Sequence, residues 1–276
     1  MKSDSDRLDA IARAHLKDPR DASHRMHRYE APGEFAGFLQ WFWIPVWSVP
    51  PGQEAPQKVL QYPNSLIVVA QDYARFYGVV AGLSTTTLTG DGWAVGVACA
   101  PSAGYLLARA PMSEFTDRAV DVGEVLGDAG HVLTDRVRTA MSDDPMSPAA
   151  HADAIAAFAD ALRPHLPVDA EGELVNRLVA FVESRSDVTR VAQVCGEFGL
   201  SERALQRLVH RRIGLTPKWL IQRRRLQEAA ERLRTSGTSL ADVAAALGYA
   251  DQPHFSRDFS AVTGMTPREF AALHAP

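Results

Sequence analysis

The first part of the chain alternates short apolar or β-branched runs with turn-forming residues. Between residues 29 and 110 these runs are separated by breaks such as Pro63-Asn64. Runs of this length bounded by Gly, Pro, Asn or Asp are typical of β-strands. Asp91-Gly92 predicts a tight hairpin turn, and the short spacing favours a small sandwich or barrel. The expected strands cover residues 59–62, 66–70, 74–80, 85–89 and 93–100.

Downstream of residue 120 the apolar positions follow a helical period. Their recurrence at intervals of three and four predicts amphipathic helices at 120–141 and 149–163. Pro164 and Pro167 then end the second helix, because proline lacks an amide hydrogen and has a fixed φ. We therefore expect a domain boundary at 164–172. The apolar faces of the two helices would suit either a dimer interface or a link between domains.

The C-terminal region contains one pattern twice. The offset between the copies is 49 as far as Gly199 and Gly248 and 50 afterwards, so the second copy has one extra turn residue. Residues 217–234 lie between the copies and predict a long basic helix. The matched positions are Val194/Val243, Cys195/Ala244, Gly199/Gly248, Leu205/Phe255, Arg207/Arg257, Val209/Phe259, Gly214/Gly264 and Pro217/Pro267.

Each copy has the properties of a helix-turn-helix. A small residue in the first helix allows close packing on the second, and the following glycine can adopt the left-handed conformation that ends a helix. Ser201 is the expected N-cap of the second helix in the first copy. Leu205, Leu208 and Val209 share one face of that helix. Its arginine and glutamine side chains are therefore expected on the outer face.

This segment resembles a known family. Residues 243–270 resemble the signature of the AraC/XylS family of transcription regulators, and residues 199–229 resemble its first unit and linker helix. The resemblance implies that two recognition helices enter successive major grooves on one face of DNA. The signature positions matched are Gly248, Tyr249, Phe255, Arg257, Phe259, Gly264, Thr266, Pro267 and Phe270.

The resemblance also implies which side chains contact DNA. Arginine and glutamine can form paired hydrogen bonds with guanine and adenine edges in the major groove, whereas phosphate contacts position a protein without reading sequence. The base-reading candidates are Arg203, Gln206 and Arg207 in the first unit and Gln252, His254, Ser256 and Arg257 in the second. The phosphate-contacting candidates are Arg211, Arg212, Lys218, Arg223 and Arg224.

The distribution of charge supports this interpretation although the whole chain has a net charge of −4. Residues 201–234 contain 10 basic and 3 acidic side chains, whereas residues 235–276 contain 2 basic and 4 acidic ones. A polyanion responds to charge within about 8–10 Å rather than to the global sum. We therefore expect the first unit and the linker helix to supply most of the electrostatic affinity for DNA.

Residues 29–126 resemble, more loosely, the sensor-like domain that precedes some AraC-type DNA-binding domains. The similar stretches are an aromatic entry at 38–47, an apolar strand after a turn at 63–70, and residues 96–111. Core packing is the favoured role for the tryptophans of the entry. The alternative is that they line a small-molecule pocket, since such pockets often use aromatic side chains. The pocket candidates are Trp41, Trp43 and Trp47.

Several classes of protein find little support. No apolar run approaches the ~18 residues of a membrane span, and the first residues lack a signal core, so a cytoplasmic location is expected. Cys99 and Cys195 are too isolated to indicate a disulfide framework or a structural zinc site. Nucleophile and phosphate-binding motifs are missing or in the wrong context. We therefore predict no enzymatic activity, no cofactor and no metal.

The sequence thus predicts an α+β fold. An N-terminal β-rich domain with helices, sandwich-like or barrel-like, precedes an all-α domain of two helix-turn-helix units joined by a linker helix. The expected segments are an N-terminal arm at 1–28, a sensor or dimerisation domain at 29–142, a connecting helix and linker at 143–170, and a DNA-binding domain at 171–276. Within the last segment, the first unit covers about 191–213, the linker helix 217–234 and the second unit 240–262.

The expected function is sequence-specific regulation of transcription, as an activator controlled by a ligand or partner through the N-terminal domain. The expected partners are double-stranded promoter DNA and RNA polymerase, while a small-molecule effector and a homodimer remain open. No membrane partner is predicted. The alternative is a protein-interaction or small-molecule-binding module whose helical domain does not bind DNA directly.

Overall fold

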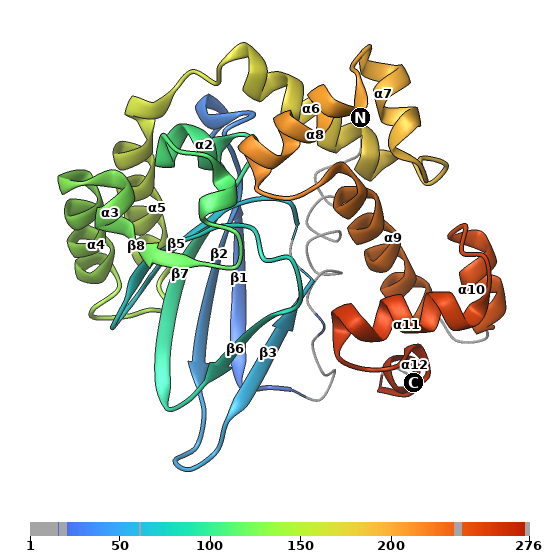
Figure 1. The fold of residues 1–276 in the computed structure, drawn as a ribbon. Coiled ribbons are helices and arrows are strands. Elements are labelled where there is room, and N and C mark those ends of the chain that lie inside the picture. Colours follow the sequence, from blue (N-terminus) through green and yellow to red (C-terminus); the bar gives the residue numbers. More distant parts are fainter. Residues whose placement is uncertain (1–15, 17–20, 61, 235–238, 274–276) are drawn as a thin grey trace.

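The computed structural model describes residues 16, 21–60, 62–234 and 239–273. Strands dominate before residue 100 and helices after it (Figure 1). The strands are β1 His24–Glu30, β2 Leu39–Ser48, β3 Ala55–Val59, β4 Leu66–Ala70, β5 Ala74–Tyr77, β6 Ser84–Leu88, β7 Asp91–Cys99 and β8 Ala119–Asp121. The helices are η1 Gly33–Phe35, α2 Ala103–Ala108, η2 Met112–Glu114, α3 Val122–Leu126, α4 Asp128–Ala140, α5 Pro148–Leu162, η3 Arg163–His165, α6 Ala170–Ser184, α7 Val191–Phe198, α8 Glu202–Ile213, α9 Pro217–Leu233, α10 Leu240–Ala246, α11 Gln252–Thr263 and α12 Pro267–Leu273.

Antiparallel strands form the N-terminal region. Within the described residues, one sheet has the order β1-β2-β7-β4-β5-β8, and β3 pairs with β6 in a second sheet of two strands. Alternate residues of β7 face opposite sides of the sheet. Val95 and Val97 join the core that includes α4 and α5, whereas Ala94 belongs to a smaller cluster on the other side. This arrangement, followed by helices to the end, confirms the predicted α+β fold class.

The predicted hairpin at Asp91-Gly92 is wrong. Both residues lie inside β7, where Asp91 pairs with Ser48 and Gly92 with Trp47 of β2. The chain turns at Gly90, whose φ of 56° suits glycine. The strands on either side of this turn do not pair with each other, since β6 belongs to the two-stranded sheet and β7 to the larger one.

Several element boundaries differ from the expected ones. Strand β1 begins at His24, inside the stretch expected to be an N-terminal arm, and residues 1–15 and 17–20 lie outside the described part of the chain. The expected strand at 59–62 is displaced, because β3 ends at Val59. The first expected long helix is divided into α3 and α4 at Gly127, which has a φ of 59°.

The C-terminal helices enclose two further apolar cores. One lies among α6, α7, α8 and the first half of α9, and the other lies between the second half of α9 and α10–α12. Residues of the N-terminal region enter both, with Val79 in the first and Leu60 in the second. In Figure 1, α9 leads from the neighbourhood of α6 and α8 down to α10–α12. No helix in the described ranges is long and apolar enough to cross a membrane.

Candidate DNA-binding surface

The first helix-turn-helix consists of α7 and α8. Gly199 ends α7 in the left-handed conformation with a φ of 63°, as predicted from its place in the repeat. Ser201 then caps α8 by accepting a hydrogen bond from the amide of Ala204 at 3.2 Å. Leu205 and Val209 are fully buried against the neighbouring helices. The turn and the buried stripe together fix which face of α8 points outward.

The three base-reading candidates of the first unit lie on that outward face. Arg203, Gln206 and Arg207 are all exposed. The Gln206 side-chain amide donates to the carboxylate of Glu202 at 3.1 Å. Arg203 and Arg207 make no hydrogen bond or ion pair with any part of the chain that the structure describes, so their guanidinium groups are available to an outside partner.

The second unit consists of α10 and α11 and repeats this design. Asp251 caps α11 by accepting a hydrogen bond from the amide of His254 at 2.7 Å, and Phe255 and Phe259 are fully buried. The side chains expected to read bases differ in exposure: Gln252, His254 and Arg257 are exposed, and Ser256 is half-buried. The His254 ring also lies 3.8 Å from the carboxylate of Asp258 on the same helix.

The five residues predicted to contact phosphate differ in exposure, and the burial of three of them corrects the prediction. Lys218 is exposed, and Arg211 is half-buried and paired with Glu171. Arg212, Arg223 and Arg224 are buried, with 2%, 2% and 7% of their surfaces exposed. Their donors are directed toward the protein itself, so these three arginines cannot reach a phosphate in this structure.

Arg212 in α8 contacts both α6 and the N-terminal region. It pairs with Asp169 and Glu171 at the start of α6, and its guanidinium carbon lies 4.2 Å from the ring centroid of Tyr105 in α2. Burial acts to lower the pKa of Arg212, but the hydrogen bonds that its guanidinium donates to the two carboxylates outweigh burial and raise the pKa. The hydrogen bond from Arg212 likewise lowers the pKa of Asp169.

The lowered pKa of Asp169 gives a testable pH dependence. Replacing Asp169 by asparagine keeps an N-cap for α6 but removes the charge facing Arg212. A carboxylate with a depressed native pKa contributes stability above its unfolded pKa of about 3.9, and this contribution is lost as the pH falls through the native value. We expect Asp169→Asn to lower the free energy of unfolding by about 1 kcal/mol at pH 7, since 46% of the Asp169 side chain is exposed and solvent screens the pair.

Denaturant unfolding of both proteins between pH 7 and pH 3 checks this expectation. The difference between wild type and Asp169→Asn should shrink below about pH 4. A difference that stayed constant down to pH 3 would contradict the assigned ion pair.

Arg223 and Arg224 of α9 are buried because this helix has neighbours on several sides. The Arg223 side chain donates to backbone carbonyls of the loop between β5 and β6, and Arg224 donates to the carbonyl of Val188. The sequence held one sign of this arrangement. The apolar residues Leu220, Ile221 and Leu226 stand on either side of the three arginines in the sequence. Because successive residues of a helix point about 100° apart, three consecutive arginines cannot all lie on the face opposite these apolar residues.

The tryptophans considered for a ligand pocket occupy the second face of the larger sheet. The rings of Trp43 and Trp47 lie directly over Gly96 and Gly92 of β7, where an added Cβ atom would overlap them. Both join a small cluster with buried Val68, Ala70 and Ala94. Trp41 packs edge-on against Tyr62, with ring centroids 5.8 Å apart. All three are half-buried, and their role as pocket residues stays a prediction.

The chain matches two protein families. Residues 194–272 match a helix-turn-helix domain family, and residues 27–121 match a family described as a domain of unknown function (DUF6597). Curated relatives include the HTH-type transcriptional activator RhaS from Escherichia fergusonii and from Escherichia coli O1:K1, each 35% identical over 96 residues. Each alignment covers 34% of this chain and 34% of the relative, so the chain spans about a third of the length of these relatives.

Two solved structures align with the chain at TM-scores below 0.5. A transcriptional regulator with an AraC-type DNA-binding domain from Chromobacterium violaceum aligns with 27% identity and a TM-score of 0.34, covering 36% of this chain and 88% of that one. ToxT from Vibrio cholerae O395 aligns with 13% identity and a TM-score of 0.40, covering 92% of this chain and 99% of that one.

The fold and the exposed helix faces define a double helix-turn-helix protein. The repeated signature and the matches to the helix-turn-helix family and to RhaS identify the C-terminal region as a helix-turn-helix domain of the AraC type.

Proposed function

We propose that the chain is a sequence-specific DNA-binding regulator of transcription in the cytoplasm, in which α8 and α11 read bases. The observation that carries this proposal is the exposed face of α8, where Arg203 and Arg207 flank Gln206 and have no partner in the described chain. The same helix buries its aliphatic stripe, so this face cannot turn inward without opening the core. Exposed arginine and glutamine on a rigid helix suit direct contact with guanine and adenine edges.

The proposed contacts fall into two groups. Base edges are read by Arg203, Gln206 and Arg207 on α8 and by Gln252, His254, Ser256 and Arg257 on α11. Backbone phosphates are contacted by Lys218 and by Arg211, whose pairing with Glu171 at a half-exposed site leaves donors able to exchange partners. The first unit provides the larger electrostatic share, because α11 presents exposed Arg257 beside the acidic Asp251 and Asp258.

A selection of bound sequences from random double-stranded DNA with the full chain tests the proposal. We expect enrichment of a site with two half-sites, as two recognition helices require. Failure of any sequence to enrich would contradict DNA binding and favour the protein-interaction alternative.

Substitutions then test the assigned contacts on the selected site. Arg203→Ala and Arg207→Ala should each weaken binding by about tenfold to hundredfold. Lys218→Ala should reduce the slope of the logarithm of the binding constant against the logarithm of the salt concentration by about 1, without changing the selected sequence. Arg257→Ala should cost less affinity than Arg207→Ala. Exposed Arg177 on α6, which lies outside both recognition helices, supplies the charge-matched control Arg177→Ala. Equal losses for Arg177→Ala and Arg207→Ala would show that only net charge matters.

The N-terminal region is proposed to control occupancy of the DNA site through a ligand or a partner. The proposed effector site is the aromatic face of the larger sheet, where Trp43 and Trp47 are partly buried. Helix α4 exposes Val132, which a second copy of the chain would cover. Activation through RNA polymerase is proposed because the RhaS relatives are named activators. Gel filtration at micromolar concentration tests whether the protein forms a homodimer. Elution at the mass of a monomer alone would contradict the dimer.

A further inference from the structure

Three consecutive arginines of α9 bind three different parts of the protein. Successive residues of an α-helix point about 100° apart, so Arg223, Arg224 and Arg225 diverge around the helix axis. Each has its own backbone acceptor: the first in the β5–β6 loop, the second in the turn before α7 and the third at the end of α10. A single short segment of α9 therefore touches the N-terminal region and both helix-turn-helix units.

Arg223 joins α9 to the N-terminal region. One terminal nitrogen lies 2.8 Å from the carbonyl oxygen of Ala81 and 2.7 Å from that of Gly82. The indole of Trp219, one turn earlier, also donates to the Ala81 carbonyl at 2.9 Å, and the Arg223 guanidinium carbon lies 4.8 Å from the Trp219 ring centroid. Burial lowers the pKa of Arg223 to about 10, so the group remains charged at neutral pH.

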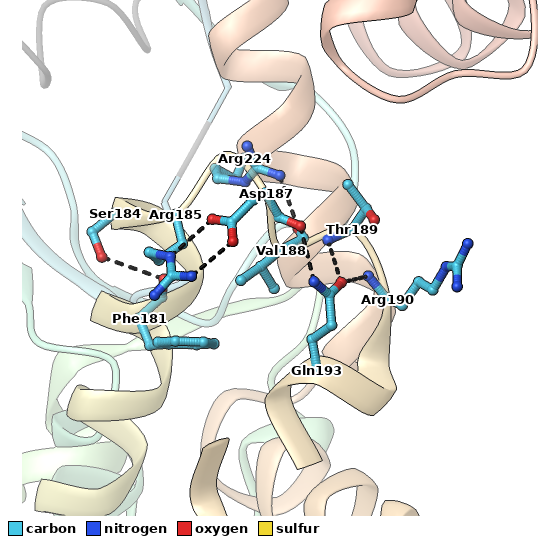
Figure 2. A network of polar contacts seen from close by, with 9 residues as sticks. All are labelled: Phe181, Ser184, Arg185, Asp187, Val188, Thr189, Arg190, Gln193 and Arg224. Atoms are coloured by element: carbon cyan, nitrogen blue, oxygen red, sulfur yellow. Dashed lines mark hydrogen bonds and ion pairs between the residues drawn. The ribbon is translucent and has the colours of Figure 1, made fainter. Parts of the chain in front are cut away.

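Arg224 joins α9 to the turn that leads into the first unit. Its guanidinium donates to the carbonyl of Val188 at 3.0 Å and to the carboxylate of Glu228 at 2.9 Å. Figure 2 shows the surrounding network in the turn between α6 and α7. There the Gln193 side chain accepts from the amides of Thr189 and Arg190 at 2.9 Å each, which holds the turn at the start of α7. The bond to Val188 therefore anchors a turn that is itself ordered.

Arg225 joins α9 to the second unit. Its Nε donates to the carbonyl of Leu247 at 2.8 Å, and its guanidinium carbon lies 3.8 Å from the ring centroid of Tyr249. Leu247 is the C-cap of α10, where the last carbonyls of a helix have no partner inside the helix. The hydrogen bond and the stacking together fix the turn that leads into α11.

We propose that Arg224 and Arg225 are positioning residues that set the separation and orientation of the two recognition helices, and that neighbouring Arg223 fixes this pair to the N-terminal region. The inference rests on the proposed DNA-binding function. It assigns these arginines a role in recognising the spacing between two half-sites rather than in contacting phosphate. A planar guanidinium suits this role, because it can stack and donate in one fixed geometry.

A series of DNA sites with altered spacing between the half-sites tests the proposal in the full chain. We expect wild type to lose at least tenfold in affinity when two base pairs are inserted between the half-sites. Arg225→Met should bind the native spacing about tenfold more weakly and respond less than threefold to the insertion. Binding to a single half-site should stay within twofold of wild type, and Arg225→Lys should be intermediate.

Arg223→Met is the matched control, because it removes the same charge from the adjacent position without touching either unit. It should retain the spacing dependence of wild type and raise hydrogen exchange in residues 78–83, which Arg225→Met should leave unchanged. Thermal unfolding of each variant establishes that it is folded at the assay temperature.

Two results would overturn the inference while leaving DNA binding intact. One is a spacing dependence of Arg225→Met equal to that of wild type. The other is an equal loss of spacing dependence in Arg223→Met. That result would mean that a general weakening of α9, and not the bond to the second unit, causes the loss of spacing dependence. Failure of wild type to bind any DNA would instead remove the proposed function itself.

Discussion

Replacing Gly214 by alanine is expected to lower the free energy of unfolding by about 2–5 kcal/mol. Gly214 ends α8 with a φ of 93°, a conformation that costs an L-residue about 1–2 kcal/mol. An alanine Cβ would also lie 2.7 Å from the carbonyl oxygen of Met112 and would overlap the Thr116 hydroxyl. Relieving such overpacking costs a further 1–3 kcal/mol or so. The clash lies between the first unit and η2, so the variant should also weaken the packing of the first unit against the N-terminal region.

The internal repeat supplies a matched control for this variant. Gly264 ends α11 in the same left-handed conformation with a φ of 72°, but nothing lies within 4 Å of its would-be Cβ. Gly264→Ala should therefore show only the backbone cost of about 1–2 kcal/mol. Urea denaturation measures both changes. Equal losses at the two positions would show that the contact between Gly214 and η2 contributes nothing.

Replacing Gly96 by valine is expected to destabilise the protein by about 3 kcal/mol, because the added side chain would occupy the position of the Trp43 ring. The backbone of Gly96 does not have positive φ, so the effect is steric. Trp43 should be displaced from the sheet, with a red shift in tryptophan fluorescence as the indole becomes exposed.

A double-mutant cycle isolates this contact. In a Trp43→Ala background the space above Gly96 is free, and Gly96→Val should then cost less than about 1 kcal/mol. Coupling of this size is normal for residues in direct contact. Additive losses in the cycle would contradict the stacking of Trp43 on β7.

The helix-turn-helix region was predictable because its local signals are independent of the rest of the chain. Gly199 requires a left-handed backbone, and Ser201 and Asp251 cap the helices that follow, whatever those helices contact. The outward position of Arg203 and Arg207 follows from the same period. The repeat shows each signal twice, and α9 covers Pro217–Leu233 where residues 217–234 were expected to form the linker helix.

The remaining features depended on contacts that no local pattern contains. The Asp91-Gly92 pair has the composition of a turn, but pairing with β2 extends β7 through it. Arg212 and Arg223 have the composition of a phosphate-binding surface, and only the position of the N-terminal region shows that Tyr105 and the Ala81 carbonyl are their partners. The helical period predicts on which face of a helix a charged residue lies, but not which part of the protein packs against that face.

Because Arg225 of α9 binds the end of α10, the number of residues in α9 determines how the second unit is oriented. One residue inserted into α9 after Arg225 would turn everything downstream by about 100° and move it by about 1.5 Å. The Leu247 carbonyl would then face away from its arginine, and α11 would approach a different side of the duplex. Homologous proteins that recognise the same half-site separation are thus expected to tolerate changes of side chain along this helix far more readily than insertions or deletions.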